Sequence, residues 1–204
     1  MGQAPSPRST IAALAALGMA TSAAAQSAAP ATTASRDLPV TGSAPQVCAL
    51  QDGQIQPGGL INIAGTSGAS LQIEQFVDPQ TLAARAASAT VDFTAVCNFP
   101  HTMRIESQGN GLWPTDGRIS GPLQGFAYAV PYTAVVNWGG SNATLTADGK
   151  VRQIVQQSFA IDQPAQGTLS LRVEIAEGAS NVENRAPVMA GAYADTLRIF
   201  LEPR

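Results

Sequence analysis

Few residues of this 204-residue chain could carry out chemistry, and they are widely separated. His101 is the only histidine, so a catalytic arrangement of serine, histidine and carboxylate would have to include it. It stands two residues before Met103, where an alternating apolar pattern begins, and a histidine at a strand end usually has no catalytic role. We therefore expect no enzymatic activity, with a secreted hydrolase that uses His101 as the alternative.

The usual motifs for metal or cofactor binding are also missing from the sequence. Cys48 and Cys97 lack CxxC spacing, the carboxylates are dispersed singly, and the glycines of "GNG" and "TSG" precede no helical pattern. We expect no metal and no cofactor. The net charge is −3 and Lys150 is the only lysine, which argues against binding to nucleic acid.

Residues 1–25 are typical of a signal peptide. Arg8 precedes the apolar run "IAALAALGMA", and the small residues Ala23 and Ala25 precede Gln26 at a suitable cleavage point. This run is too short to span a bilayer, and no later stretch approaches the roughly 18–20 apolar residues that a membrane helix needs. We expect a mature chain without a transmembrane segment, which passes through the periplasm and is then at the cell surface or secreted.

The two cysteines match this exported location. An even number of cysteines in an oxidising compartment favours a disulfide between Cys48 and Cys97, and two unpaired buried thiols are the alternative. The bond would close a loop of about 50 residues, which the chain-entropy model values at about 4 kcal/mol.

From residue 47 onward, short alternating segments separated by turn residues indicate an all-β sandwich or barrel. The clearest alternation lies in residues 89–97 and 167–175. Asp148 and Gly149 predict the turn of a β-hairpin. One short helix is expected near residues 78–89, where Asp78 can cap it and Pro79 suits the first helical position.

Five aromatic residues could line a sugar-binding surface or fill the core of the sandwich: Trp113, Trp138, Tyr128, Tyr132 and Tyr193. We favour packing in the core, because the neighbouring strand patterns contain mostly small apolar residues.

Residues 26–46 are rich in Ala, Ser, Thr and Pro and contain too few bulky apolar residues to fold alone. We expect them to form a flexible N-terminal extension of a β-sandwich domain at residues 47–204. In an extended conformation Leu38, Val40 and Gly42 would share one face.

The last strand pattern raises a question of pairing. Every second residue from Tyr193 to Leu201 falls on one side, and four of these five are apolar or aromatic. Such a strand needs a partner along each edge or a cover over its backbone. The sequence does not reveal what this strand pairs with.

The order of these features resembles the spore coat protein U domain, which subunits of the archaic type of chaperone–usher fimbriae use. The resemblance covers roughly residues 47–204 and rests on "FTAVC", "MRIES", "PYTAVVNWGG" and "AGAYADTLRIFLEP". Its most specific part is the final block, at Gly191, Tyr193, Asp195 and Thr196.

The resemblance implies an immunoglobulin-like β-sandwich that lacks its final strand. The terminal strand would then border an open acceptor groove, along Gly191, Tyr193, Asp195, Thr196, Leu197, Ile199 and Leu201. A periplasmic chaperone would cover this groove first. At the outer-membrane usher, the extension of a neighbouring subunit would replace the chaperone, with Leu38, Val40 and Gly42 as its donor-strand residues.

On this basis we expect an exported structural subunit of a surface fimbria that supports adhesion or biofilm formation. The alternative is a self-contained β-sandwich in the periplasm or outside the cell, which binds a glycan or a protein through its aromatic residues. In that alternative the N-terminal extension would be a linker or would complete its own sandwich.

Overall fold

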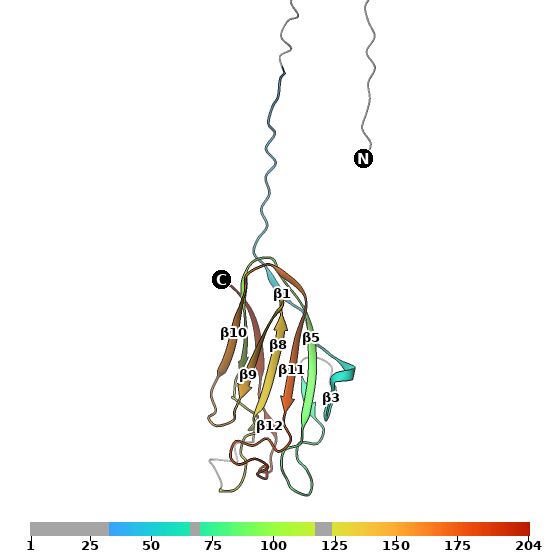
Figure 1. Cartoon of the computed structure of the whole chain (residues 1–204), viewed down its shortest axis with the longest axis vertical. Helices are drawn as coiled ribbons and strands as arrows, with labels where there is room; N and C mark the ends of the chain where they lie inside the picture. The colour runs from blue at the N-terminus through green and yellow to red at the C-terminus, as the bar shows by residue number, and fades with distance from the viewer. Residues whose placement is uncertain (1–32, 66–69, 117–123) are drawn as a thin grey trace, which may run out of the picture. The chain divides into compact units, whose positions relative to one another are not determined.

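Antiparallel β-strands form nearly all the regular structure in the described part of this protein (Figure 1). The computed structural model describes residues 33–65, 70–116 and 124–204, and within these it has one 3₁₀ turn, Pro57–Gly59, and no α-helix. The predicted all-β sandwich is therefore confirmed. The described residues fall into two units with a boundary between Gly42 and Ser43, and every strand lies in the second unit.

The larger sheet has six strands in the order β1-β5-β11-β8-β9, with β2 also paired to β5. These strands are β1 (Cys48–Leu50), β2 (Gln54–Ile55), β5 (Ala87–Cys97), β8 (Tyr132–Trp138), β9 (Ser141–Ala147) and β11 (Ala165–Ile175). Because β11 pairs with β5 along its whole length, β1 and β2 share the opposite edge of β5.

The smaller sheet has three strands in the order β10-β6-β13. They are β10 (Val155–Ile161), β6 (His101–Ser107) and β13 (Leu197–Pro203). Two short ribbons complete the fold: β7 (Trp113–Pro114) with β12 (Tyr193–Ala194), and β3 (Ile63–Gly65) with β4 (Leu71–Ile73).

The core lies between the two sheets, because alternation turns every second side chain of each long strand inward. Many inward residues of the larger sheet are alanines, for example Ala89, Ala134 and Ala147. The buried rings of Tyr132 and Trp138 supply volume between them. For these two residues the packing interpretation of the aromatics is confirmed.

The predicted helix near residues 78–89 is wrong. Asp78 does cap a turn: its Oδ1 accepts a hydrogen bond from the backbone N–H of Thr81 at 2.9 Å, which holds the pKa of Asp78 below its ordinary value. Leu82 then takes a left-handed conformation with φ of 58°, and the turn ends. The following alanines form helices well in isolation, but here Ala87 begins β5 and is buried, so tertiary packing overrides their propensity.

The predicted hairpin at Asp148 and Gly149 is also wrong. The turn exists, since Gly149 has φ of 67° and Asp148 accepts a hydrogen bond from the N–H of Lys150 at 3.0 Å. However, β9 before it and β10 after it belong to different sheets. The two-residue hairpin joins β8 to β9 instead, through Gly139 and Gly140 with φ of 58° and 79°.

The predicted disulfide is confirmed. Cys48 and Cys97 are bonded to each other and lie directly opposite in β1 and β5. Among the described residues, no helix is long and apolar enough to cross a membrane. The predicted signal peptide, residues 1–25, lies outside the described residues.

Candidate functional site

The last strand of the chain lies at the edge of the smaller sheet. β13 pairs along its length with β6, so that Ile199 stands opposite Ile105 and Leu201 opposite Met103. No other strand of the described residues pairs with β13. Within residues 33–65, 70–116 and 124–204, the last strand therefore has a partner on one side only.

The inward side chains of β13 are less covered than those of its neighbour. Leu197, Ile199 and Leu201 contact the core but are only half-buried. Met103 and Ile105, on β6, are both 0% exposed. An apolar row of this kind, beside an unpaired backbone edge, is suited to cover by an added strand.

The predicted strand from residue 193 to residue 201 is interrupted at Asp195 and Thr196. The part before the interruption, β12, pairs with β7, whereas β13 pairs with β6. Asp195 therefore lies outside β13 and does not extend the apolar row of Leu197, Ile199 and Leu201. Its carboxylate instead accepts hydrogen bonds from other parts of the chain.

Five hydrogen bonds converge on the carboxylate of Asp195. Its Oδ1 accepts from the backbone N–H groups of Gly109 and Thr196, both at 2.7 Å. Its Oδ2 accepts from the hydroxyls of Ser107 and Tyr132, both at 2.6 Å, and from the backbone N–H of Gly111 at 3.4 Å. Because Tyr132 belongs to β8, this side chain links the start of β13 to the larger sheet. Hydrogen bonds to a charged acceptor are worth about 1.5–3 kcal/mol each, so the carboxylate of Asp195 holds the start of β13 firmly in place.

The phenol of Tyr132 is kept neutral by this arrangement. Burial raises the pKa of Tyr132 far above its ordinary value, and the hydrogen bond to Asp195 raises it further. An ionised phenolate would lose its donated proton and face the carboxylate of Asp195. The link between the sheets therefore depends on the neutral phenol.

Gly191 and Tyr193 lie beside an apolar cavity of about 510 Å³. Its lining consists of Phe76, Val77, Leu82, Phe126, Val188, Met189, Ala190 and Gly191. The ring of Tyr193 lies 5.0 Å from that of Phe76, and its hydroxyl donates to the carbonyl of Met189 at 2.9 Å. The structure divides the seven predicted acceptor residues. Leu197, Ile199 and Leu201 lie on β13. Gly191 lines the cavity, and Tyr193 contacts Phe76 in the cavity lining. Asp195 and Thr196 instead form the hydrogen-bonded junction.

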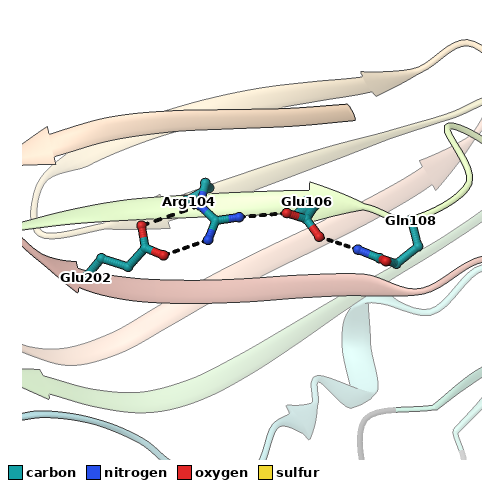
Figure 2. A network of polar contacts seen from close by, with 4 residues as sticks. All are labelled: Arg104, Glu106, Gln108 and Glu202. Carbon is teal, nitrogen blue, oxygen red and sulfur yellow. Dashed lines mark hydrogen bonds and ion pairs between the residues drawn. The ribbon is translucent and has the colours of Figure 1, made fainter. Parts of the chain in front are cut away.

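The outer face of the smaller sheet carries a closed network of charges (Figure 2). Arg104 on β6 donates hydrogen bonds to Glu202 and to Glu106, both at 2.6 Å, and lies 3.8 Å from the centre of the Phe200 ring. Gln108 donates to the second oxygen of Glu106. The hydrogen bond with Glu202 raises the pKa of Arg104 and lowers that of Glu202. These groups satisfy one another, so this face needs no further ligand.

The predicted donor residues are exposed. Leu38 and Val40 are 85% and 90% exposed, and Gly42 has open space around its Cα. The described part of the extension has no helix or strand. The extension ends where Asn98 binds it. The side-chain amide of Asn98 donates a hydrogen bond to the carbonyl of Pro45 at 2.8 Å, which fixes the chain just before β1.

His101 is enclosed and 0% exposed. Its Nε2 lies 2.8 Å from Nε1 of Trp138, an indole N–H that can only donate, so Nδ1 carries the proton and donates to the carbonyl of Phe99 at 2.9 Å. A ring nitrogen and the sulfurs of Cys48 and Cys97 lie within 4.8 Å of one another. The sulfurs are bonded to each other and both nitrogens are engaged, so His101 offers no free nitrogen for proton transfer or metal binding.

Comparison with known proteins gives no match for this chain, either among protein-family models or among curated proteins. We therefore base the proposed function on the edge strand, the exposed extension and the junction at Asp195.

Proposed function

We propose that this chain is an exported structural subunit of a surface fimbria and that its copies join by donor-strand complementation. The N-terminal extension of one copy adds as a strand to the free edge of β13 in the next copy. A periplasmic chaperone covers that edge before assembly, and an outer-membrane usher delivers the subunits to the cell surface. The resulting fimbria supports adhesion or biofilm formation.

The one-sided pairing of β13 is the observation that carries this proposal. An unpaired edge presents backbone N–H and C=O groups in the geometry that an added strand needs. The same strand would cover the half-buried row of Leu197, Ile199 and Leu201. Without such a cover, a backbone edge next to apolar side chains promotes aggregation, which is why a chaperone is part of the proposal.

The extension has the properties of a donor. Leu38 and Val40 are its bulky side chains on one face, and both are highly exposed in the single chain. Gly42 follows on the same face and would suit a shallow position. Pro39 has no N–H group, so it is compatible with a strand that pairs mainly along one edge.

Deletion of residues 26–46 separates the two roles of a subunit. The shortened protein should still accept an extension from another copy but should form no multimers alone. Mixed with the full mature chain, it should cap multimers and shorten them, as measured by electrophoresis of unheated samples in SDS and by electron microscopy. Filament growth from the shortened protein alone would contradict the proposal.

A single substitution tests the donor face. Leu38→Asp should abolish SDS-resistant multimers and leave the unfolding midpoint of the domain unchanged, because Leu38 is 85% exposed in the single chain. Thr41→Asp is the matched control, since it adds the same charge on the opposite face of the extension. Equal loss in both variants, or in neither, would refute the assigned face. A mature chain that stays monomeric at high concentration without a chaperone would favour the self-contained binding module.

A further inference from the structure

The outer face of the larger sheet carries a row of polar side chains that crosses five strands in register. In this row Gln54 on β2 stands opposite Asp92 on β5, which stands opposite Ser170 on β11. Ser170 in turn stands opposite Asn137 on β8, and Asn137 opposite Asn142 on β9. Each alternates along its strand with inward-facing neighbours, so the row points away from the core.

A cavity of about 410 Å³ lies over four members of this row, Asp92, Ser170, Asn137 and Asn142. This volume falls within the range of about 300–1,000 Å³ that is usual for small-molecule sites. The β8–β9 turn forms part of the lining with two glycines, and Gly140 has open space where a side chain would be. The turn therefore leaves the cavity accessible from solvent.

Several polar side chains of this cavity make no hydrogen bond to the described residues. Oδ1 of Asp92 is the one buried side-chain oxygen or nitrogen there that lacks a hydrogen bond. The side chains of Asn137, Asn142 and Ser170 also make none within the described part of the chain. By contrast, Asn110 binds both Asp148 and the backbone through its amide. Buried polar atoms normally have partners, so Oδ1 of Asp92 is an exception among the described residues, and the exposed amides of Asn137 and Asn142 beside it are available to a ligand.

The chemistry of the lining indicates the class of that ligand. Amide and hydroxyl groups both donate and accept hydrogen bonds, and a carboxylate accepts strongly, which matches the adjacent hydroxyls of a sugar. No Lys or Arg belongs to the lining, which disfavours an anionic ligand, and Asp92 is its only acidic residue. Most small-molecule sites are lined by hydrophobic and aromatic side chains, whereas most residues of this lining carry polar side chains: Asp92, Asn137, Ser141, Asn142, Thr168 and Ser170.

We propose that this face of the larger sheet binds a neutral carbohydrate, with Asp92 and Asn137 as the central recognition residues. The ring of Trp138 is turned into the core, so recognition depends on hydrogen bonds more than on stacking. The site lies on a different sheet from β13. It is therefore independent of the way in which copies of the chain join.

An array of immobilised neutral oligosaccharides, including glucans, mannans, galactans and chitin oligomers, tests the proposal with the mature protein. We expect retention of at least one class, followed by a measurable affinity for the same free oligosaccharide. Asn137→Ala and Asp92→Asn should each weaken that affinity about tenfold or more, because each removes hydrogen bonds made only to the ligand. Thr146→Ala, on the same face of β9 but outside the cavity, is the control and should bind as the unchanged protein does.

The stability of Asp92→Asn gives a second readout. Because this substitution neutralises a carboxylate that has an unsatisfied buried oxygen, the ligand-free variant should melt at the same or a higher temperature than the unchanged protein while binding more weakly. The proposal is overturned if no oligosaccharide is retained, if both cavity variants bind normally, or if Ca²⁺ alone binds at Asp92 and oligosaccharides do not.

Discussion

The two sheets of this sandwich complete their edges in different ways. In the larger sheet, the edge of β5 is covered by β1 and β2, and the Cys48–Cys97 disulfide fastens β1 to it covalently. In the smaller sheet, β13 pairs with β6 alone among the described strands, and the hydrogen bonds to Asp195 hold its start. This difference indicates that a covalent link secures the short edge strand β1 of the larger sheet, while the edge strand proposed for assembly, β13, is held by pairing with β6 and by one carboxylate.

The largest effect is expected from removing the covalent fastening of the larger sheet. The double variant Cys48→Ser, Cys97→Ser should lose about 4 kcal/mol of unfolding free energy, because the unfolded chain regains the freedom of a loop of about 50 residues. Guanidinium unfolding of the variant and of the unchanged protein measures the difference. A loss below about 1 kcal/mol would show that strand pairing alone secures β1.

Asp195→Ala should have the next largest effect. It leaves the hydroxyls of Ser107 and Tyr132 and three backbone N–H groups without this acceptor, which should cost about 3 kcal/mol or more. Asp162→Ala is the control, because Asp162 is exposed and pairs only with Arg204, so it should cost less than about 1 kcal/mol. Similar losses of unfolding free energy in the two variants would contradict the proposed role of Asp195 in fixing the junction.

A smaller effect is expected from pH, through Tyr132. Since burial and Asp195 raise the pKa of this phenol, its contribution to stability is fully present below the unfolded pKa of about 10 and is lost as the pH rises above it. Melting temperatures between pH 7 and pH 11 should therefore fall steeply at the alkaline end. Tyr132→Phe should cost about 1 kcal/mol at neutral pH and flatten the alkaline fall. Burial also raises the pKa of Tyr193, which should account for part of the remaining slope.

The smallest effect is expected on the outer face of the smaller sheet. Glu202→Gln removes one of the two carboxylates bound to Arg104, and the side chain of Glu202 is 44% exposed. An exposed ion pair contributes about 0–1 kcal/mol and is weakened by salt. The loss should therefore be smaller than the loss expected for Asp195→Ala, and it should decrease in high salt. A larger loss would mean that this network, like the junction at Asp195, fixes β13.

The local pattern of the sequence was sufficient to predict the main strands and the disulfide. Alternation predicted the strand cores of β5 and β11, and the even pair of cysteines predicted the bond that joins β1 to β5. These predictions hold because strand periodicity and covalent pairing depend on few distant contacts. The helix near residues 78–89 failed for the opposite reason, because the alanines after Leu82 are needed in a buried strand.

The two sites depend on register, which a single sequence does not specify. Asp195 matched the alternation of the last strand, but its carboxylate instead accepts hydrogen bonds from two other parts of the chain, residues 107–111 and Tyr132. Likewise, Asp92, Ser170 and Asn137 come from strands far apart in the chain and become neighbours only through the order β5-β11-β8. Each of these residues alone looks like an ordinary solvent-facing polar position.

The position of Trp138 gives the molecule an optical reporter of its own. Its indole donates to His101, the two rings are 6.1 Å apart, and a nitrogen of that imidazole lies within 4.8 Å of the disulfide sulfurs. A disulfide quenches indole fluorescence at short range. Detachment of the first strand would therefore brighten and red-shift the emission of Trp138, so that the state of this end of the domain can be followed by fluorescence without an added label.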